Sequence, residues 1–186
     1  MYIWWGKNFS DKIKVIVKRS IWRHDIDRWK ATCLFYPELE VYRDIVKRNT
    51  MHVWWNLVKI HPFLHKYVSA VLSVLMGGQP RFFGCNFERS FCKICSTDEV
   101  DTPAHVLFKC ETLVEIRDRW WGGVTNTMPP AMASNLNSLD NDMKLKFILS
   151  CMNCDNFIPE WMDSLMSISK FVFYMYQGRK LKYDIL

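Results

Sequence analysis

Three cysteines and one histidine in the middle of the chain have the residue types and the spacing of a metal site. Cys92, Cys95, His105 and Cys110 follow the pattern C-x2-C-x9-H-x4-C and fall within 19 residues. Three thiolates and one imidazole complete a tetrahedral set for one zinc ion, and a site with no position left for water is structural rather than catalytic. Thr102 predicts a capped short helix that begins just before His105 and ends near Cys110. The alternative is that the cysteines are small core residues that hold no metal.

The composition predicts a folded intracellular protein. The chain has 186 residues, of which 49% are hydrophobic, and it contains 9 Trp, 12 Phe and 7 Tyr, a content that argues against disorder. The count of 7 cysteines is odd, and residues 1–10 lack the apolar core of a secretory leader. Both features favour a reducing compartment and metal-binding thiols over disulfides. The apolar run at 67–76 is too short to span a bilayer, so no membrane partner is expected.

The positive charge lies in the first third of the chain. Residues 1–60 hold 12 Lys and Arg against 6 Asp and Glu, whereas the remainder holds 13 of each. This asymmetry predicts a polyanionic partner, RNA or DNA, on one side of the molecule. If residues 10–30 are helical, four cations form one stripe, and two more lie near the metal ligands; a solvated face is the alternative for the stripe. The candidate nucleic-acid contacts are Lys12, Arg19, Arg23, Lys30, Arg81 and Lys93.

The apolar periodicity and the Pro and Gly positions predict a mainly α fold, with bundle-like helical halves flanking a small CCHC zinc knuckle. The expected parts are a basic and aromatic helical region (1–78), a zinc-knuckle region with the helix that follows it (79–123), and a C-terminal helical region (124–186). A Thr112-x-x-Glu115 capping box and Gly122-Gly123 bound the helix after the knuckle, and a polar loop follows to residue 138. The expected helices cover residues 10–30 (where a strand is an alternative), 37–48, 50–60, 62–76, 112–121, 140–150 and 159–178, and a basic tail follows at 179–182.

The zinc stretch and its flanks resemble a known family. Cys92-Lys93-Ile94-Cys95, His105 to Cys110, and then Leu113 and Arg117 resemble the zinc region near the C-terminus of reverse transcriptases from non-LTR (LINE-type) retrotransposons. The likeness extends upstream through 71–78 and downstream to 148–150, 158–161, 174–176 and Arg179. In that family the zinc region is taken to help hold template RNA or target DNA near the polymerase. The resemblance therefore implies a ribonucleoprotein of nucleus and cytoplasm.

Three departures limit what the resemblance implies. The chain contains no Tyr-x-Asp-Asp polymerase motif and no endonuclease region, so no catalysis of its own is expected. The nine-residue spacer from Cys95 to His105 is much longer than the spacer of four residues in retroviral knuckles. Cys151 and Cys154 fall where the family has a serine, glycine and asparagine turn, and free thiols are the favoured interpretation.

Three functions remain in competition. The first is a non-catalytic nucleic-acid-binding region of a LINE-type reverse transcriptase. The second is a zinc-stapled interaction or scaffold module, including a freestanding relative adapted by a host genome, whose partner is another protein chain or the remaining domains of a reverse transcriptase. The third is a nuclease, suggested only by the D-x-K form of Asp142-Met143-Lys144, where acids are also expected because a helix begins there.

Overall fold

The computed structural model describes residues 53–75, 91–95, 97–150 and 161–185. Most residues in these ranges are helical. The β-type pairing described there is an isolated antiparallel bridge between Phe91 and Val100. The mainly α class is therefore confirmed. The predicted helices at 10–30 and 37–48, the loop around Arg81, and Cys151 and Cys154 lie outside the described residues. The α-helices are α3 (Val53–Ile60), α4 (His65–Leu75), α5 (Val114–Asn126), α6 (Pro130–Ser138), α7 (Asn141–Ser150) and α8 (Met162–Tyr183), and shorter turns cover Pro62–Leu64, His105–Lys109 and Glu111–Leu113.

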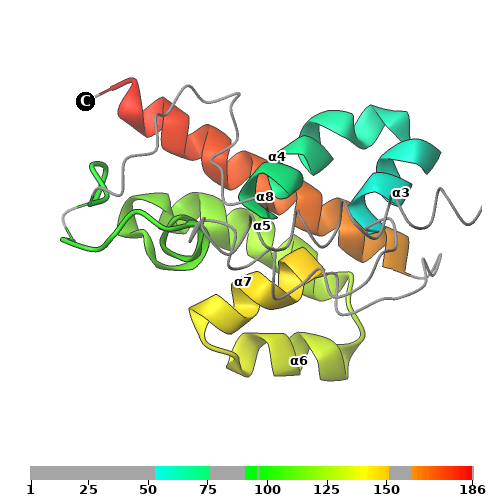
Figure 1. Ribbon diagram of the computed structural model, residues 1–186. Coiled ribbons are helices and arrows are strands. Elements are labelled where there is room, and N and C mark those ends of the chain that lie inside the picture. The colour runs from blue at the N-terminus through cyan, green and yellow to red at the C-terminus, as the bar shows by residue number, and fades with distance from the viewer. Residues whose placement is uncertain (1–52, 76–90, 96, 151–160, 186) are drawn as a thin grey trace, which may run out of the picture.

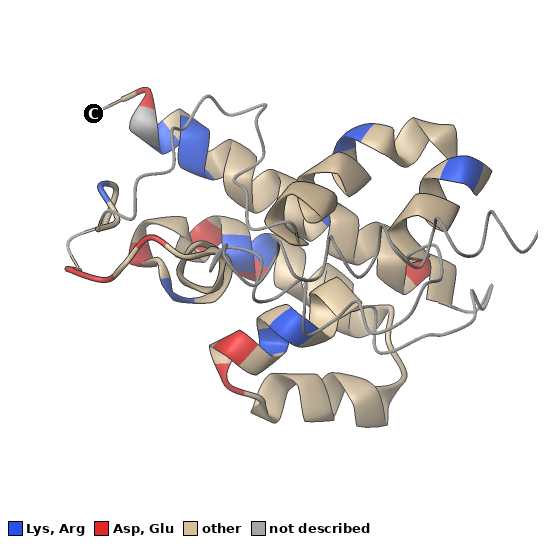
Figure 2. Ribbon diagram, in the orientation of Figure 1, with Lys and Arg blue, Asp and Glu red and all other residues tan. Residues whose placement is uncertain are grey.

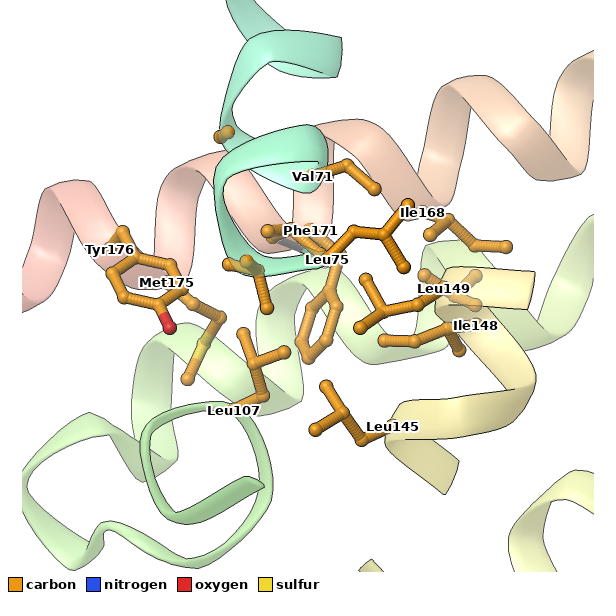
Figure 3. Packing of buried hydrophobic residues seen from close by; sticks show 14 of the residues in the cluster. Val71, Leu75, Leu107, Leu145, Ile148, Leu149, Ile168, Phe171, Met175 and Tyr176 are labelled. Carbon is orange, nitrogen blue, oxygen red and sulfur yellow. The ribbon is translucent and has the colours of Figure 1, made fainter. Parts of the chain in front are cut away.

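The long helix α8 organises the described fold, because it packs along both α4 and α5 (Figure 1). Its apolar residues recur at intervals of three and four, the spacing that places them on one face of a helix. Leu165, Ile168, Val172 and Met175 are all buried, as the sequence predicts. Figure 3 shows side chains of this face meeting residues from the other elements, among them Leu75 of α4, Leu107 beside the cysteine-histidine cluster, and Leu145, Ile148 and Leu149 of α7.

Helices α3 and α7 are joined through a buried tryptophan. Trp54 is fully buried, and its indole N–H donates a 3.0 Å hydrogen bond to the backbone carbonyl of Leu149. A buried indole needs such a partner, because an unsatisfied donor is costly away from water. Helix α7 begins where the sequence predicts, since the carboxylate of Asp140 accepts a 2.7 Å hydrogen bond from the backbone N–H of Met143.

The predictions for residues 112–138 are wrong in two respects. The Thr112 capping box does not form, because α5 begins at Val114 and the Thr112 hydroxyl is used elsewhere. Helix α5 also continues through Gly122-Gly123 to Asn126, and the expected loop contains α6, which begins at Pro130. Each glycine weakens a helix by about 1 kcal/mol, but burial of Val124 beyond them favours continuation. A proline at the first helical position has no N–H to leave unpaired, so it suits the start of α6.

The predicted end of α8 and the basic tail are also wrong. The helix runs past Gly178 to Tyr183. Gly178 instead permits close packing, because a Cβ atom there would lie 2.1 Å from Cδ1 of Ile116 on α5. Arg179 does not belong to a solvated tail: it is 2% exposed and forms an ion pair with the buried carboxylate of Asp101. This pair joins α8 to the segment that carries the metal-ligand candidates.

Candidate metal centre

The four residues predicted as metal ligands converge in the structure. Their ligand atoms, three sulfurs and one ring nitrogen, all lie within 4.8 Å of one another. Within the cluster, Cys95 Sγ and His105 Nε2 are 3.4 Å apart. A tetrahedral ion with bonds of about 2.0–2.3 Å requires ligand-to-ligand distances of roughly 3.3–3.8 Å. The cluster of Cys92, Cys95, His105 and Cys110 could therefore hold one metal ion with only small side-chain adjustments.

The first two cysteines are positioned by a short backbone loop. The N–H of Cys92 donates a 2.9 Å hydrogen bond to the carbonyl of Glu99, and the antiparallel bridge between Phe91 and Val100 closes the loop. This pairing brings the residues that follow Cys95 back alongside Phe91 and Cys92. Cys92 is buried and Cys95 is half-buried, so the cluster sits just beneath the surface.

The other two ligands are positioned by an unusual helical turn. The Thr102 hydroxyl accepts a 3.1 Å hydrogen bond from the N–H of His105, which confirms the predicted cap. In an α-helix, residues five apart would point about 140° away from each other, given 3.6 residues per turn. Here the N–H of Cys110 instead donates a 2.8 Å hydrogen bond to the carbonyl of His105, which makes the turn π-helical. The wider turn brings Cys110 back to the side of His105, and such turns are frequent at functional sites.

A carboxylate outside the cluster orients the histidine ring. Glu99 Oε2 lies 3.0 Å from His105 Nδ1, and the same oxygen lies 3.6 Å from Nζ of Lys109. An ionised carboxylate can only accept, so Nδ1 carries the proton and the lone pair of Nε2 faces the sulfurs. The hydrogen bond with His105 lowers the pKa of Glu99, which favours its ionised form. Metal-binding histidines commonly have such a partner, which fixes the ring and strengthens it as a donor.

Two further side chains tie the ligand-bearing segments together. The Thr112 hydroxyl donates a 2.5 Å hydrogen bond to the carbonyl of Ile94, which links the start of α5 to the first loop. Arg117 of α5 donates to the carbonyl of Leu107 at 3.0 Å and to the carbonyl of Cys110 at 2.6 Å. These bonds tie α5 to the π-helical turn and to Cys110, whose carbonyl also accepts a 3.2 Å hydrogen bond from the N–H of Leu113.

The thiols have unequal affinities for protons. Burial raises the pKa of Cys92. Burial, together with the neighbouring Cys92 and Cys95, raises the pKa of Cys110 to about 12. Burial also acts against the thiolate of Cys95, but hydrogen bonds with Thr97 and Cys92 outweigh it and lower the pKa of Cys95 to about 7. Crowding three sulfurs disfavours three negative charges, and a bound cation is the group that would relieve this repulsion.

One of the six predicted nucleic-acid contacts lies within the described residues, beside this centre. Lys93 is exposed on the loop between the first two cysteines. Lys12, Arg19, Arg23, Lys30 and Arg81 lie outside the described residues. Sequence reasoning missed the orienting role of Glu99 and the anchoring roles of Thr112 and Arg117. Only Glu99 had a local signal, an acid six residues before the histidine.

Comparison of the chain with protein families, with curated proteins and with solved structures finds no match. Every helix in the described ranges is too short or too polar to traverse a lipid bilayer.

Proposed function

We propose that the chain is a zinc-stabilised, non-catalytic region that binds RNA or DNA, comparable to the C-terminal region of a LINE-type reverse transcriptase. The observation that supports it most is the convergence of Cys92, Cys95, His105 and Cys110 within 4.8 Å, since these residues also carry the sequence resemblance. Three soft sulfurs and one imidazole suit zinc better than magnesium or calcium, which prefer oxygen. When bound, zinc would supply a closed structural junction and no reactive position.

The proposed role of zinc is to hold together a segment with little core of its own. The described part of residues 91–113 contains short turns and the bridge between Phe91 and Val100, and the cluster lies where this segment meets α5. Structural zinc in small sites contributes on the order of 10 kcal/mol to folding. Elemental analysis of purified protein should find one zinc per chain. The Cys110→Ser variant should lose it, whereas Thr97→Ser, a change beside the cluster that removes no ligand, should retain it.

The nucleic-acid part of the proposal is supported by the excess of cations in residues 1–60 and by the exposure of Lys93 beside the cluster. Phosphate contacts make binding strongly dependent on salt and weakly dependent on sequence. The double variant Arg19→Gln/Arg23→Gln should weaken binding of single-stranded RNA and flatten the dependence of log K on log salt. Unchanged affinity would show that the stripe is a solvated face.

A second candidate, the interaction or scaffold module, is favoured by apolar exposure on and after α3. Trp55 is 52% exposed and Phe63 is 69% exposed. Large exposed apolar side chains often mark a surface that another protein covers. Size-exclusion chromatography separates the two candidates: an oligomer without affinity for nucleic acid would support the scaffold and contradict the nucleic-acid proposal. A blank plasmid-nicking assay with added divalent metal is expected, because no catalytic role is proposed for Asp142 and Lys144.

A further inference from the structure

A row of four aromatic side chains crosses three helices of the described fold. Trp120 of α5 stacks on Tyr174 of α8, with ring centroids 4.1 Å apart and planes 11° from parallel. Tyr174 in turn lies 6.1 Å from Tyr67 of α4, and Tyr67 lies 5.0 Å from Phe173 of α8. The row therefore follows three helices from distant parts of the sequence, and Figure 1 shows α8 lying beside both α4 and α5.

The aromatic row is only half-buried. Tyr67, Trp120, Phe173 and Tyr174 each retain part of their surface in solvent, whereas the neighbouring Phe171 and Tyr176 of α8 are buried in the core. Rings whose only role is to fill space between helices would be expected to bury as fully as those two. Aromatic rings that stay accessible in a row offer π-faces and edges on which other planar groups can stack.

Two lysines lie beside the part of the row that belongs to α4 and α8. Nζ of Lys66 lies 4.7 Å from the centroid of Tyr67 and 5.7 Å from that of Phe173. Lys170 is close enough to Tyr67 to act on it electrostatically. Among the described residues, neither lysine forms an ion pair with a carboxylate. Helix α4 contains no acidic residue, and Asp163, in the first turn of α8, is the only acid of that helix (Figure 2).

We infer that this aromatic row is a stacking surface for the unpaired bases of a single-stranded nucleic acid, with Lys66 and Lys170 contacting the phosphates beside them. The inference rests on the proposed nucleic-acid function and names residues for it. Surfaces that bind single strands without sequence preference combine aromatic platforms for bases with nearby cations for the backbone. Both parts occur together here, on residues that the sequence did not single out as contacts.

The first experiment measures binding of a fluorescent short oligouridine, and of oligothymidine of the same length, to the zinc-loaded full chain. The Lys66→Gln/Lys170→Gln variant should weaken binding about tenfold at physiological salt and reduce the salt slope by about 1.4, since each phosphate contact on a single strand contributes about 0.7. The matched control is Lys144→Gln, which removes a cation from α7, a helix that packs mainly on α6 and the π-helical turn. It should change neither quantity. Equal binding of RNA and DNA is expected if stacking dominates.

The second experiment uses the wild-type chain. Its result therefore does not depend on whether a variant with altered rings would fold. A strand containing 4-thiouridine is cross-linked to the wild-type chain by light, and the tryptic peptide that follows Lys170 and contains Phe173 and Tyr174 should carry the adduct. Cross-links confined to other peptides, with normal binding by the double-lysine variant, would overturn this inference and leave the proposed function standing. A chain that binds no strand at all would overturn both. Self-association through this face without strand binding would assign it to a protein contact instead.

Discussion

Replacing Arg179 with methionine should destabilise the protein more than removal of any exposed charge. Arg179 is 2% exposed and Asp101 is 7% exposed, so water cannot replace the lost partner of the carboxylate. Breaking a buried ion pair by removing one member costs about 3–5 kcal/mol. For a chain of this size, 1 kcal/mol corresponds to about 2–4 °C in Tm. The Arg179→Met variant should therefore melt roughly 6–20 °C below the wild type.

The double variant Asp101→Leu/Arg179→Met tests whether the pair itself is responsible. With both charges gone, no buried ion lacks its partner, so the free energy of unfolding should return to within about 1–2 kcal/mol of the wild type. Urea unfolding of the wild type, the two single variants and the double variant gives the coupling energy directly. Lys180→Met, the adjacent cation on α8, is the control and should change stability by less than about 0.5 kcal/mol.

The same variants report on the metal centre. Asp101 follows Val100, which forms the bridge to Phe91, and precedes Thr102, which caps the turn that carries His105. Loss of the pair should therefore also weaken metal affinity, measured by competition with a chromophoric chelator. A stability change in Arg179→Met of less than about 1 kcal/mol, together with zero coupling in the cycle, would refute the reasoning, because the pair would then be solvated.

The remaining predictions concern the metal and the glycines. Metal binding at pH 7 should release about two to three protons, because the thiols of Cys92 and Cys110 are protonated and that of Cys95 is about half protonated. Metal affinity should therefore rise with pH. Calorimetry in buffers of different ionisation enthalpy counts the released protons. Glu99→Gln should lower metal affinity about 10–100-fold, because it weakens the group that accepts the hydrogen bond from Nδ1 of His105. The control Glu111→Gln, at an exposed site, should leave metal affinity unchanged. Equal effects of the two variants would contradict the orienting role of Glu99. Gly122→Ala should raise the free energy of unfolding by about 0.5–1 kcal/mol, because nothing lies within 4 Å of the added Cβ. Gly178→Ala should lower it by about 1–3 kcal/mol, and the double variant Gly178→Ala/Ile116→Val, which lacks the clashing methyl, should recover part of the loss. Thermal melts of these variants and of the wild type make the comparison.

Local patterns explain why much of the helical fold could be predicted. The apolar spacing of α8 and the acid that precedes α7 depend on residues within one or two turns of each other. Helix ends were less predictable. Gly122, Gly123 and Gly178 read as stop signals because glycine weakens an isolated helix, but packing against distant segments outweighed that local preference.

The metal-ligand set was accessible from the sequence because all four residues lie within 19 positions and their donor atoms define the chemistry. The hydrogen bonds that support these ligands could be predicted only in part. The cap from Thr102 is local, but the hydrogen bond from Thr112 to Ile94 spans 18 residues and replaces the capping box that the sequence indicated. No local rule states which of two competing partners a hydroxyl will take.

By itself, the sequence determined the donor set, the short cap before the histidine and the helical class, since each depends on neighbours along the chain. Only the tertiary structure decided that Arg179 is buried against Asp101, 78 residues away, and that rings from three helices form one half-exposed row. The physical reason is that burial and long-range pairing depend on how helices pack, and packing energies of several kcal/mol exceed the tenths of a kcal/mol by which most single residues favour one local conformation.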